Sequence, residues 1–341
     1  MDSLTHIVLS AAAAAVFVPA EHRRAALLAG AVLGTLPDLD VVALHALTDD
    51  PVELMVRHRS FTHSLLVLPV FGTMLWAWLR TRGGRVTAAP RAWFWAIQLA
   101  LVTHPLLDAC TVYGTQLLWP LPLRPVMWSA IFIIDPLYTV GLLLACLLAW
   151  RWYEDAAARR ALVAGLVLSS LYLGFAFYAK WQVERAAESS LAAMGLEDAP
   201  RFSVPMPFNT LLWRVVAMTP DGYVEGDRSI VADRGAMRFT RYPSDTITLQ
   251  LLGSLPAVQR LRWLNHGFMK AEQRHGQLIL SDLRMGAEPD YTFRFVVARQ
   301  AQGLWQPVAP QQLDWPWDAA ARLRTMWQRI WTPQTEVVAT P

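Results

Sequence analysis

Apolar residues are concentrated in the first half of the chain, in runs that are typical of helices in a membrane. Four long runs contain almost no charged residue: 64–79, 92–107, 125–150 and 161–179. About 20 mostly apolar residues are needed to cross the hydrocarbon core of a bilayer. We therefore expect these four runs to be transmembrane helices.

Two shorter apolar runs precede them, at residues 7–18 and 25–36. Each has about 12 residues, which is short for a full crossing. They either pair as a helical hairpin against the other four helices, or they are tilted spans extended by their flanking residues. Both alternatives predict an all-α polytopic membrane bundle of about four long and two short helices over residues 1–180.

The pattern changes after Lys180. Short segments rich in β-branched and aromatic residues alternate with Gly and Pro, as in strands joined by turns. We expect strands at 211–218, 236–241, 246–252, 277–284 and 291–299. The late segment 317–331 has the apolar spacing of a helix. The sequence thus predicts a soluble, mainly β domain of the α+β class over residues 181–341.

The composition supports membrane insertion. Of the 341 residues 54% are hydrophobic and only 17% are charged, whereas soluble globular proteins carry about 25% charged residues. This excludes intrinsic disorder. The scattered basic residues and the net charge of +3 argue against nucleic-acid binding, while the 16 tryptophans favour anchoring among lipid headgroups. We expect membrane lipids as partners; no protein partner is indicated.

The arginines predict an orientation in the membrane. If every apolar run crosses, one side receives Arg23, Arg24, Arg80, Arg82, Arg85, Arg91, Arg151, Arg159 and Arg160. The other side receives only Arg57, Arg59 and Arg124. Short cytoplasmic loops carry the excess of basic residues. We therefore expect a multi-pass protein of the bacterial inner membrane, with the C-terminal domain on the periplasmic side.

His and Asp residues gather at the ends of the apolar runs, all on the expected periplasmic face. They are His6, Asp38, Asp40, His58, His63, His104, Asp108 and Asp135. Imidazole and carboxylate groups bind zinc, manganese and iron, and acids at membrane depth usually serve function. We expect the first seven to hold a divalent metal, zinc first, with enough ligands for two ions. Asp135 is an additional candidate, with helix capping before Pro136 as its alternative role.

The spacing of these residues suits metal ligation. His104 and Asp108 are four residues apart, so on a helix they share one face. Asp38 and Asp40 are two apart, and in an extended backbone they point to opposite sides. They can serve two neighbouring ions, or act as one ligand and one base. Taken singly, each residue also has a structural interpretation, such as a cap or a hydrogen bond to a carbonyl. Their gathering on one face favours the metal.

Five sequence blocks resemble a known family. They are Met-Asp-Ser-Leu-Thr-His at 1–6, Leu-Pro-Asp-Leu-Asp at 36–40, His-Arg-Ser-Phe-Thr-His-Ser at 58–64, Thr-His-Pro-Leu-Leu-Asp at 103–108 and Tyr-Gly-Thr at 113–115. In this order they resemble the bacterial inner-membrane, metal-dependent hydrolase family often called YdjM-like. Residues 134–136 and 209–213 resemble its longer members, which carry a C-terminal domain. The resemblance implies a hydrolase with these His and Asp residues as ligands.

That family is distantly similar to zinc-dependent phospholipase C and the fungal single-strand nucleases. Those enzymes hold zinc with a His near the N-terminus, an Asp, further His residues and a His-x-x-x-Asp pair on a helix. The resemblance therefore implies zinc ligands among His6, Asp38 or Asp40, His58 or His63, and His104 with Asp108. The second His-x-x-x-Asp/Glu pair of those enzymes has no clear match in this sequence.

Together these features predict a hydrolase that acts on phosphoesters of lipids or lipid-linked molecules, because a site at headgroup depth meets lipid phosphates. Asp38 or Asp40 is the expected general base. Arg57, Arg59 and Arg124 are weaker candidates for holding the substrate phosphate. The alternative is a non-catalytic metal-binding membrane protein. An ion carrier would place its ligands near the bilayer midplane, and a scaffold would bind no metal.

Overall fold

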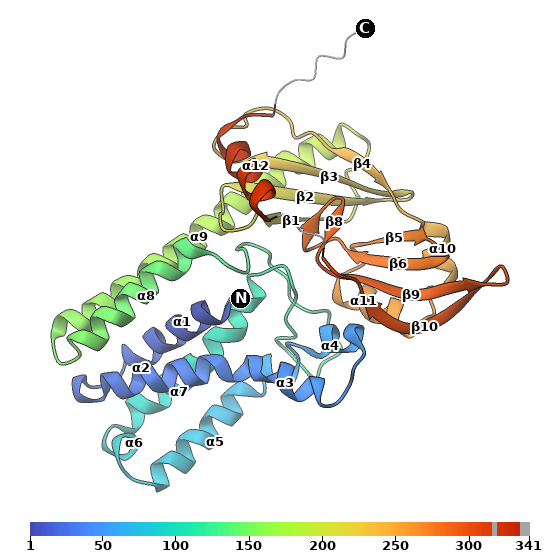
Figure 1. Cartoon of the computed structure of the whole chain (residues 1–341). Coiled ribbons are helices and arrows are strands. Elements are labelled where there is room, and N and C mark those ends of the chain that lie inside the picture. The colour runs from blue at the N-terminus through green and yellow to red at the C-terminus, as the bar shows by residue number, and fades with distance from the viewer. Residues whose placement is uncertain (316–318, 335–341) are drawn as a thin grey trace. The chain divides into compact units, whose positions relative to one another are not determined.

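The computed structural model describes residues 1–315 and 319–334 (Figure 1). The chain divides into two compact units. The first comprises Met1–Trp128 and Ile133–Gly174, and the second comprises Ser129–Phe132 and Phe175–Pro341. The first unit is helical, and the second contains the β-sheets.

The helical unit contains eight complete α-helices within the described residues and the first part of a ninth. Their bounds are α1 Ser3–Ala15, α2 Arg23–Thr35, α3 Asp40–His45, α4 Pro51–Arg57, α5 Leu68–Thr81, α6 Arg85–Ala88, α7 Pro90–Ala109, α8 Pro136–Arg151 and α9 Ala156–Ala192. Three short 3-10 helices lie between them: η1 Ala20–His22, η2 Leu36–Leu39 and η3 Phe61–His63. The last two matter most below, because they carry Asp38 and His63.

Helices α1, α2 and α7 form the core of this unit, and small side chains let them approach closely. The alanines 11–15 of α1 are all buried. A Cβ added to Gly30 of α2 would lie 2.4 Å from Ser10 O, and one added to Gly34 would lie 2.5 Å from the Ser10 side chain. Two glycines four residues apart are a common way to bring helices together in a membrane protein. The Ser10 hydroxyl in turn donates to Ala100 O of α7 at 2.9 Å.

Two helical segments within the described residues are long and apolar enough to cross a membrane, Ala20–His45 and Ala156–Ala192. A third crossing arises if Pro51–His63 and Leu68–Thr81, which meet at a bend of 52°, act as one span. The expected count of four long and two short membrane helices is not confirmed. The apolar run 25–36 lies inside a helical segment of 26 residues, and in the run 125–150 the helix begins only at Pro136.

The second unit contains two four-stranded antiparallel sheets. One has the order β1-β2-β3-β4 and the other β10-β9-β6-β5. The strands are β1 Arg201–Pro205, β2 Leu212–Thr219, β3 Gly222–Ser229, β4 Thr240–Pro243, β5 Met269–Arg274, β6 Gln277–Asp282, β9 Arg294–Ala301 and β10 Leu304–Gln312. A small hairpin joins β7 Gly286–Ala287 to β8 Asp290–Tyr291, and the helices are α10 Thr246–Leu251, α11 Pro256–Leu264 and α12 Ala319–Trp331.

The C-terminal part of α9 packs on the first of these sheets. Ala179, Val183 and Ala187 of α9 lie in one cluster with Trp213 and Val215 of β2. One step further along, Leu191 of α9 meets Ala217 of β2. The helix contributes every fourth residue and the strand every second one, as one buried face of each element requires. The chain therefore does not turn to strands directly after Lys180, since α9 continues to Ala192.

The expected strands are partly confirmed. Segments 211–218, 277–284 and 291–299 overlap β2, β6 and β9, whereas segment 236–241 overlaps β4 only at its end. The strand expected at 246–252 is wrong, because Thr246–Leu251 is a helix. Its cap is Asp245, whose carboxylate accepts the Thr248 N–H at 2.9 Å. The late helix is confirmed as α12, but residues 317 and 318 of the expected range lie outside the described residues.

Candidate metal centre

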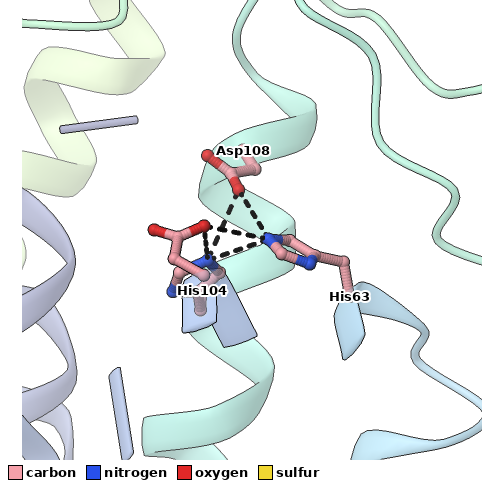
Figure 2. A group of neighbouring side chains, drawn as sticks. His63, His104 and Asp108 are labelled. Atoms are coloured by element: carbon pink, nitrogen blue, oxygen red, sulfur yellow. Dashed lines mark hydrogen bonds and ion pairs between the residues drawn. The ribbon is translucent and has the colours of Figure 1, made fainter. Parts of the chain in front are cut away.

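Four of the predicted ligands meet in the helical unit (Figure 2). Asp38 lies in η2, His63 in η3, and both His104 and Asp108 lie in the last turns of α7. Each offers one ligand atom, and these four atoms all lie within 4.8 Å of one another. The side chains of His63, His104 and Asp108 are fully buried, and Asp38 is partly exposed.

The distances between these atoms suit a tetrahedral cation. His63 Nε2 lies 3.1 Å from His104 Nε2 and 3.2 Å from Asp108 Oδ2. His104 Nε2 lies 3.4 Å from both Asp108 Oδ2 and Asp38 Oδ1, and Asp38 Oδ1 is also 3.4 Å from His63 Nε2. Zinc bonds of about 2.0–2.1 Å in a tetrahedron place neighbouring ligand atoms about 3.3 Å apart. Five of the six donor pairs therefore have a spacing that suits a zinc-sized ion, and the sixth pair, Asp38 with Asp108, lies within 4.8 Å.

The far nitrogens of both imidazoles are held by hydrogen bonds. His104 Nδ1 donates to Gly34 O at 2.7 Å. His63 Nδ1 lies 3.0 Å from Thr62 Oγ1, which itself donates to Asp40 Oδ2 at 3.0 Å. A ring with its proton on Nδ1 would direct the Nε2 lone pair toward the group. Hydrogen bonds of this kind orient metal-bound histidines and raise their basicity.

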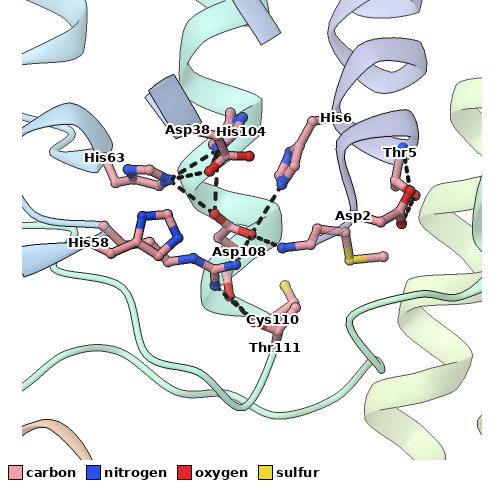
Figure 3. Close-up of polar contacts among 12 residues, drawn as sticks. Asp2, Thr5, His6, Asp38, His58, His63, His104, Asp108, Cys110 and Thr111 are labelled. Atoms are coloured by element: carbon pink, nitrogen blue, oxygen red, sulfur yellow. Dashed lines mark hydrogen bonds and ion pairs between the residues drawn. The ribbon is translucent and has the colours of Figure 1, made fainter. Parts of the chain in front are cut away.

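The other oxygen of Asp108 faces a second set of partners (Figure 3). His6 Nε2 and Arg59 Nη2 each lie 3.1 Å from Asp108 Oδ1, and the Met1 amino group also contacts it. The His6 ring stacks on the His104 ring with centroids 3.6 Å apart. His6 thus lies beside the four-ligand group rather than in it. Asp108 therefore contacts the two histidines of the group with one oxygen and Met1, His6 and Arg59 with the other.

Asp40 and His58 bind each other instead of joining the four. His58 Nδ1 lies 2.9 Å from Asp40 Oδ1. The second oxygen of Asp40 accepts the Arg59 N–H at 3.2 Å and the Thr62 hydroxyl. Asp40 thereby fixes the backbone that carries His63. Its assignment as a ligand, and that of His58, stay predictions.

Arg59 is the predicted phosphate-binding arginine that lies next to the cluster. Its side chain is almost fully buried, with Nη1 donating to Thr111 Oγ1 at 3.2 Å and the guanidinium 4.8 Å from the Tyr113 ring centroid. Its φ of 63° is unusual for a residue other than glycine and costs of order 1–3 kcal/mol. Arg57 is exposed and pairs with Glu53, and Arg124 is exposed.

Asp135 has the geometry of a helix cap. Its carboxylate accepts the N–H groups of Leu137 and Tyr138 at 3.0 and 3.2 Å, at the start of α8. It also accepts the Tyr172 hydroxyl at 2.8 Å. These contacts support the capping role that the sequence left open for Asp135.

Sequence reasoning missed two residues that shape this centre. Thr62 is not among the candidate ligands, yet its hydroxyl contacts both Asp40 and His63. Gly34 was not singled out, because its contribution is a backbone carbonyl and the absence of a side chain. The role of Thr62 could be inferred from its position directly before His63. The role of Gly34 depends on how α1, α2 and α7 pack.

The fold and this centre define a helical membrane protein with a buried His/Asp cluster that could bind a metal ion. Residues 1–183 match the sequence model of the YdjM inner membrane protein family. The match covers more than half of the chain, so the protein belongs to this family, as the sequence blocks predicted. No curated protein and no solved structure matches the chain.

Proposed function

We propose that this protein is a membrane-bound, metal-dependent hydrolase that acts on phosphoesters of lipids or lipid-linked molecules. The observation that carries the proposal is the spacing of Asp38, His63, His104 and Asp108, because five of the six pairs of ligand atoms are 3.1–3.4 Å apart, as one cation requires. Two nitrogen and two oxygen donors suit zinc, and they also suit iron or manganese. When bound, a divalent cation lowers the pKa of water and polarises a phosphoryl oxygen.

The residues of the chain would divide the remaining work. Asp38 is the one partly exposed member of the group, and its Oδ1 is the oxygen that faces the histidines. Its other carboxylate oxygen is therefore the one best placed to accept a proton from water. Asp40 is less suited to this role, because its oxygens already face three donors. Arg59 provides a buried guanidinium beside Asp108, and a guanidinium binds phosphate oxygens bidentately.

We infer that a second ion, which the number of candidate ligands allows, would bind beside His6 in exchange for the contacts that Met1 and Arg59 make with Asp108 Oδ1. His6 Nε2 and Asp108 Oδ1 are 3.1 Å apart, and the buried His6 Nδ1 has no hydrogen-bond partner among the described residues. His6 and Asp108 would hold that ion. Two ions together would supply charge stabilisation to the attacking and the leaving oxygen of an in-line displacement.

One observation favours the alternative, a metal-binding membrane protein without catalysis. Four protein ligands complete a tetrahedron, and three of these side chains are fully buried. Structural zinc sites are closed in this way, whereas catalytic sites keep a position open for water. Measurement of metal content and of hydrolysis in the same preparation separates the two functions.

The experiment compares the purified wild-type protein with His104→Ala, and with His45→Ala as the control. His45 is exposed and lies outside the group, with its ring nitrogen bonded to Val41 O. We expect wild-type protein and the control to hold about one or two equivalents of divalent metal and to release phosphate or headgroup from phospholipids. His104→Ala should lose both properties while remaining folded. Metal without hydrolysis of any phosphoester would identify the non-catalytic protein, and full metal occupancy in His104→Ala would overturn the site.

A further inference from the structure

Helix α9 carries aromatic side chains where its apolar stretch ends. Phe175, Phe177, Tyr178 and Trp181 are all exposed. The Tyr178 and Trp181 rings stack with centroids 5.9 Å apart, and the Arg185 guanidinium lies 5.2 Å from the Trp181 centroid. Residues 161–174 contain no charge, whereas charged residues are frequent from Lys180 onward. Because Trp and Tyr are enriched at the level of lipid headgroups, this cluster lies at the expected membrane exit of α9, which is a candidate span.

Strand β2 of the first sheet runs in the same direction as α9. Near the aromatic cluster, Lys180 Nζ lies 6.0 Å from the Trp213 ring centroid at the start of β2. Toward the end of the helix, Leu191 meets Ala217 near the end of β2. Leu212 of β2 pairs with Ser229 of β3. The start of β2, the end of β3 and the β1–β2 turn therefore form the end of the sheet nearest the aromatic cluster, which we call the proximal end.

Helix α12 is fixed at this proximal end (Figure 1). The Ser229 hydroxyl donates to Ile330 O at 2.6 Å, and the Ile330 side chain is buried. The Arg329 guanidinium pairs with Asp227 at 2.8 Å and with Asp233 at 2.5 Å. These contacts determine which face of α12 is turned to the domain and which face is turned outward.

The outward face of α12 combines tryptophan with arginine. Arg324, Trp327, Gln328 and Trp331 are exposed and follow the helical spacing i, i+3, i+4 and i+7. Trp327 is 63% exposed and Trp331 53%, and their rings meet edge to face with centroids 5.8 Å apart. Two further exposed apolar side chains lie at the same end of the sheet, Phe208 in the β1–β2 turn and Val231 just after β3.

We propose that this outward face of α12 lies on the headgroup surface of the membrane that α9 crosses. Three observations point to lipid: α12 lies at the end of the sheet nearest the aromatic cluster of α9, its large exposed apolar side chains among those described are Trp327 and Trp331, and Arg324 is beside them. An amphipathic helix with Trp on one side and Arg at its edge binds in the plane of the interface and prefers anionic lipids. The C-terminal domain is then held at the membrane by two elements, α9 and α12. This inference is independent of the proposed catalysis.

The test uses the full-length protein in nanodiscs of phosphatidylethanolamine and phosphatidylglycerol, some of which contain lipids with a quencher near the headgroup. A fluorophore is attached to a cysteine introduced by Gln328→Cys, after Cys110→Ala and Cys146→Ala. The matched control is Gln250→Cys on α10, where exposed Ile247 and Leu251 flank an exposed glutamine. The Ser244 N–H, two residues before α10, donates to Asp221 O in the β2–β3 turn at 3.0 Å. Helix α10 therefore begins at the end of the first sheet opposite to the proximal end.

We expect quenching at position 328 to exceed quenching at position 250 several-fold. In the labelled protein, Trp327→Ser with Trp331→Ser should reduce the signal at 328 toward that of the control, and Arg324→Gln should reduce it mainly in anionic nanodiscs. Equal quenching at the two positions, or none at 328, would overturn the proposal. Fluorophore self-quenching at 328 that disappears on dilution with unlabelled protein, without lipid quenching, would assign the face to a second copy of the chain and would also overturn it.

Discussion

At the scale of single residues, Asp108 makes more hydrogen bonds and ion pairs within the candidate centre than any other side chain described. One oxygen lies 3.2 Å from His63 and 3.4 Å from His104, and the other faces His6, Arg59 and the Met1 amino group. A fully buried carboxylate is stable only when cations and hydrogen bonds compensate its charge. Asp108 therefore has a structural role that does not depend on any metal, which makes it a poor first choice for mutagenesis.

Thr62 offers a cleaner test at this scale. Thr62→Val keeps the size of the side chain but removes the hydrogen bonds to His63 Nδ1 and Asp40 Oδ2. Loss of such a support costs about 10- to 100-fold in metal affinity. We expect this fall in a competition titration with a chelator, without loss of folded protein.

The matched control for that variant is Thr103→Val. Thr103 precedes His104 in α7, but its hydroxyl donates to Leu99 O of the same helix at 2.7 Å and to none of the ligands. Its metal affinity should stay at the wild-type value. An equal decrease in both variants would mean that Thr62 does not act through His63.

At the scale of elements, the centre depends on how closely α1, α2 and α7 approach. Gly34 lies against Ser10, and a Cβ added there would also come within 2.7 Å of His6 O. Its carbonyl oxygen holds His104. The same residue thus sets the approach of α2 to α1 and the orientation of one ligand, which links helix packing directly to the chemistry.

Gly34→Ala should therefore separate α1 from α2 and disturb the site. Overpacking of this kind costs about 1–3 kcal/mol, and we expect a lower unfolding temperature together with weaker metal binding. The control is Gly141→Ala in α8, where an added Cβ meets nothing within 4 Å and helix propensity should stabilise slightly. Thermal unfolding of both variants in the same detergent provides the measurement. A Gly34→Ala protein with the stability and metal content of the wild type would contradict this packing account.

At the scale of the whole molecule, the two compact units predict separate responses to metal removal. A ligand that binds only the folded state stabilises it by about 2.7 kcal/mol at 100 times its Kd. Treatment with EDTA should therefore speed amide hydrogen exchange in η2, η3 and the last turn of α7. Exchange in the β1–β4 sheet should not change. Faster exchange in both units would indicate that metal binding stabilises the entire chain, contrary to this expectation.

Most helices and several strands could be predicted from the sequence, because local patterns determine them. The apolar run 161–179 lies in α9, and the segment 211–218, rich in β-branched and aromatic residues, forms most of β2. The prediction failed where a single polar contact outweighed the pattern, as at Asp245, which caps α10 in a segment rich in β-branched residues. Membrane crossings were harder to count, because a run such as 125–150 begins with residues that form no helix.

The residue types of the candidate centre could also be predicted, because imidazole and carboxylate groups at the ends of apolar runs are rare unless they serve function. The spacing of His104 and Asp108 on one helix face required only the geometry of α7. Which of the other candidates would join them could not be derived in this way. Asp38 and Asp40 are two residues apart, yet one meets His104 and the other binds His58. That division depends on contacts between segments far apart in the chain, made where small residues let α1, α2 and α7 pack closely.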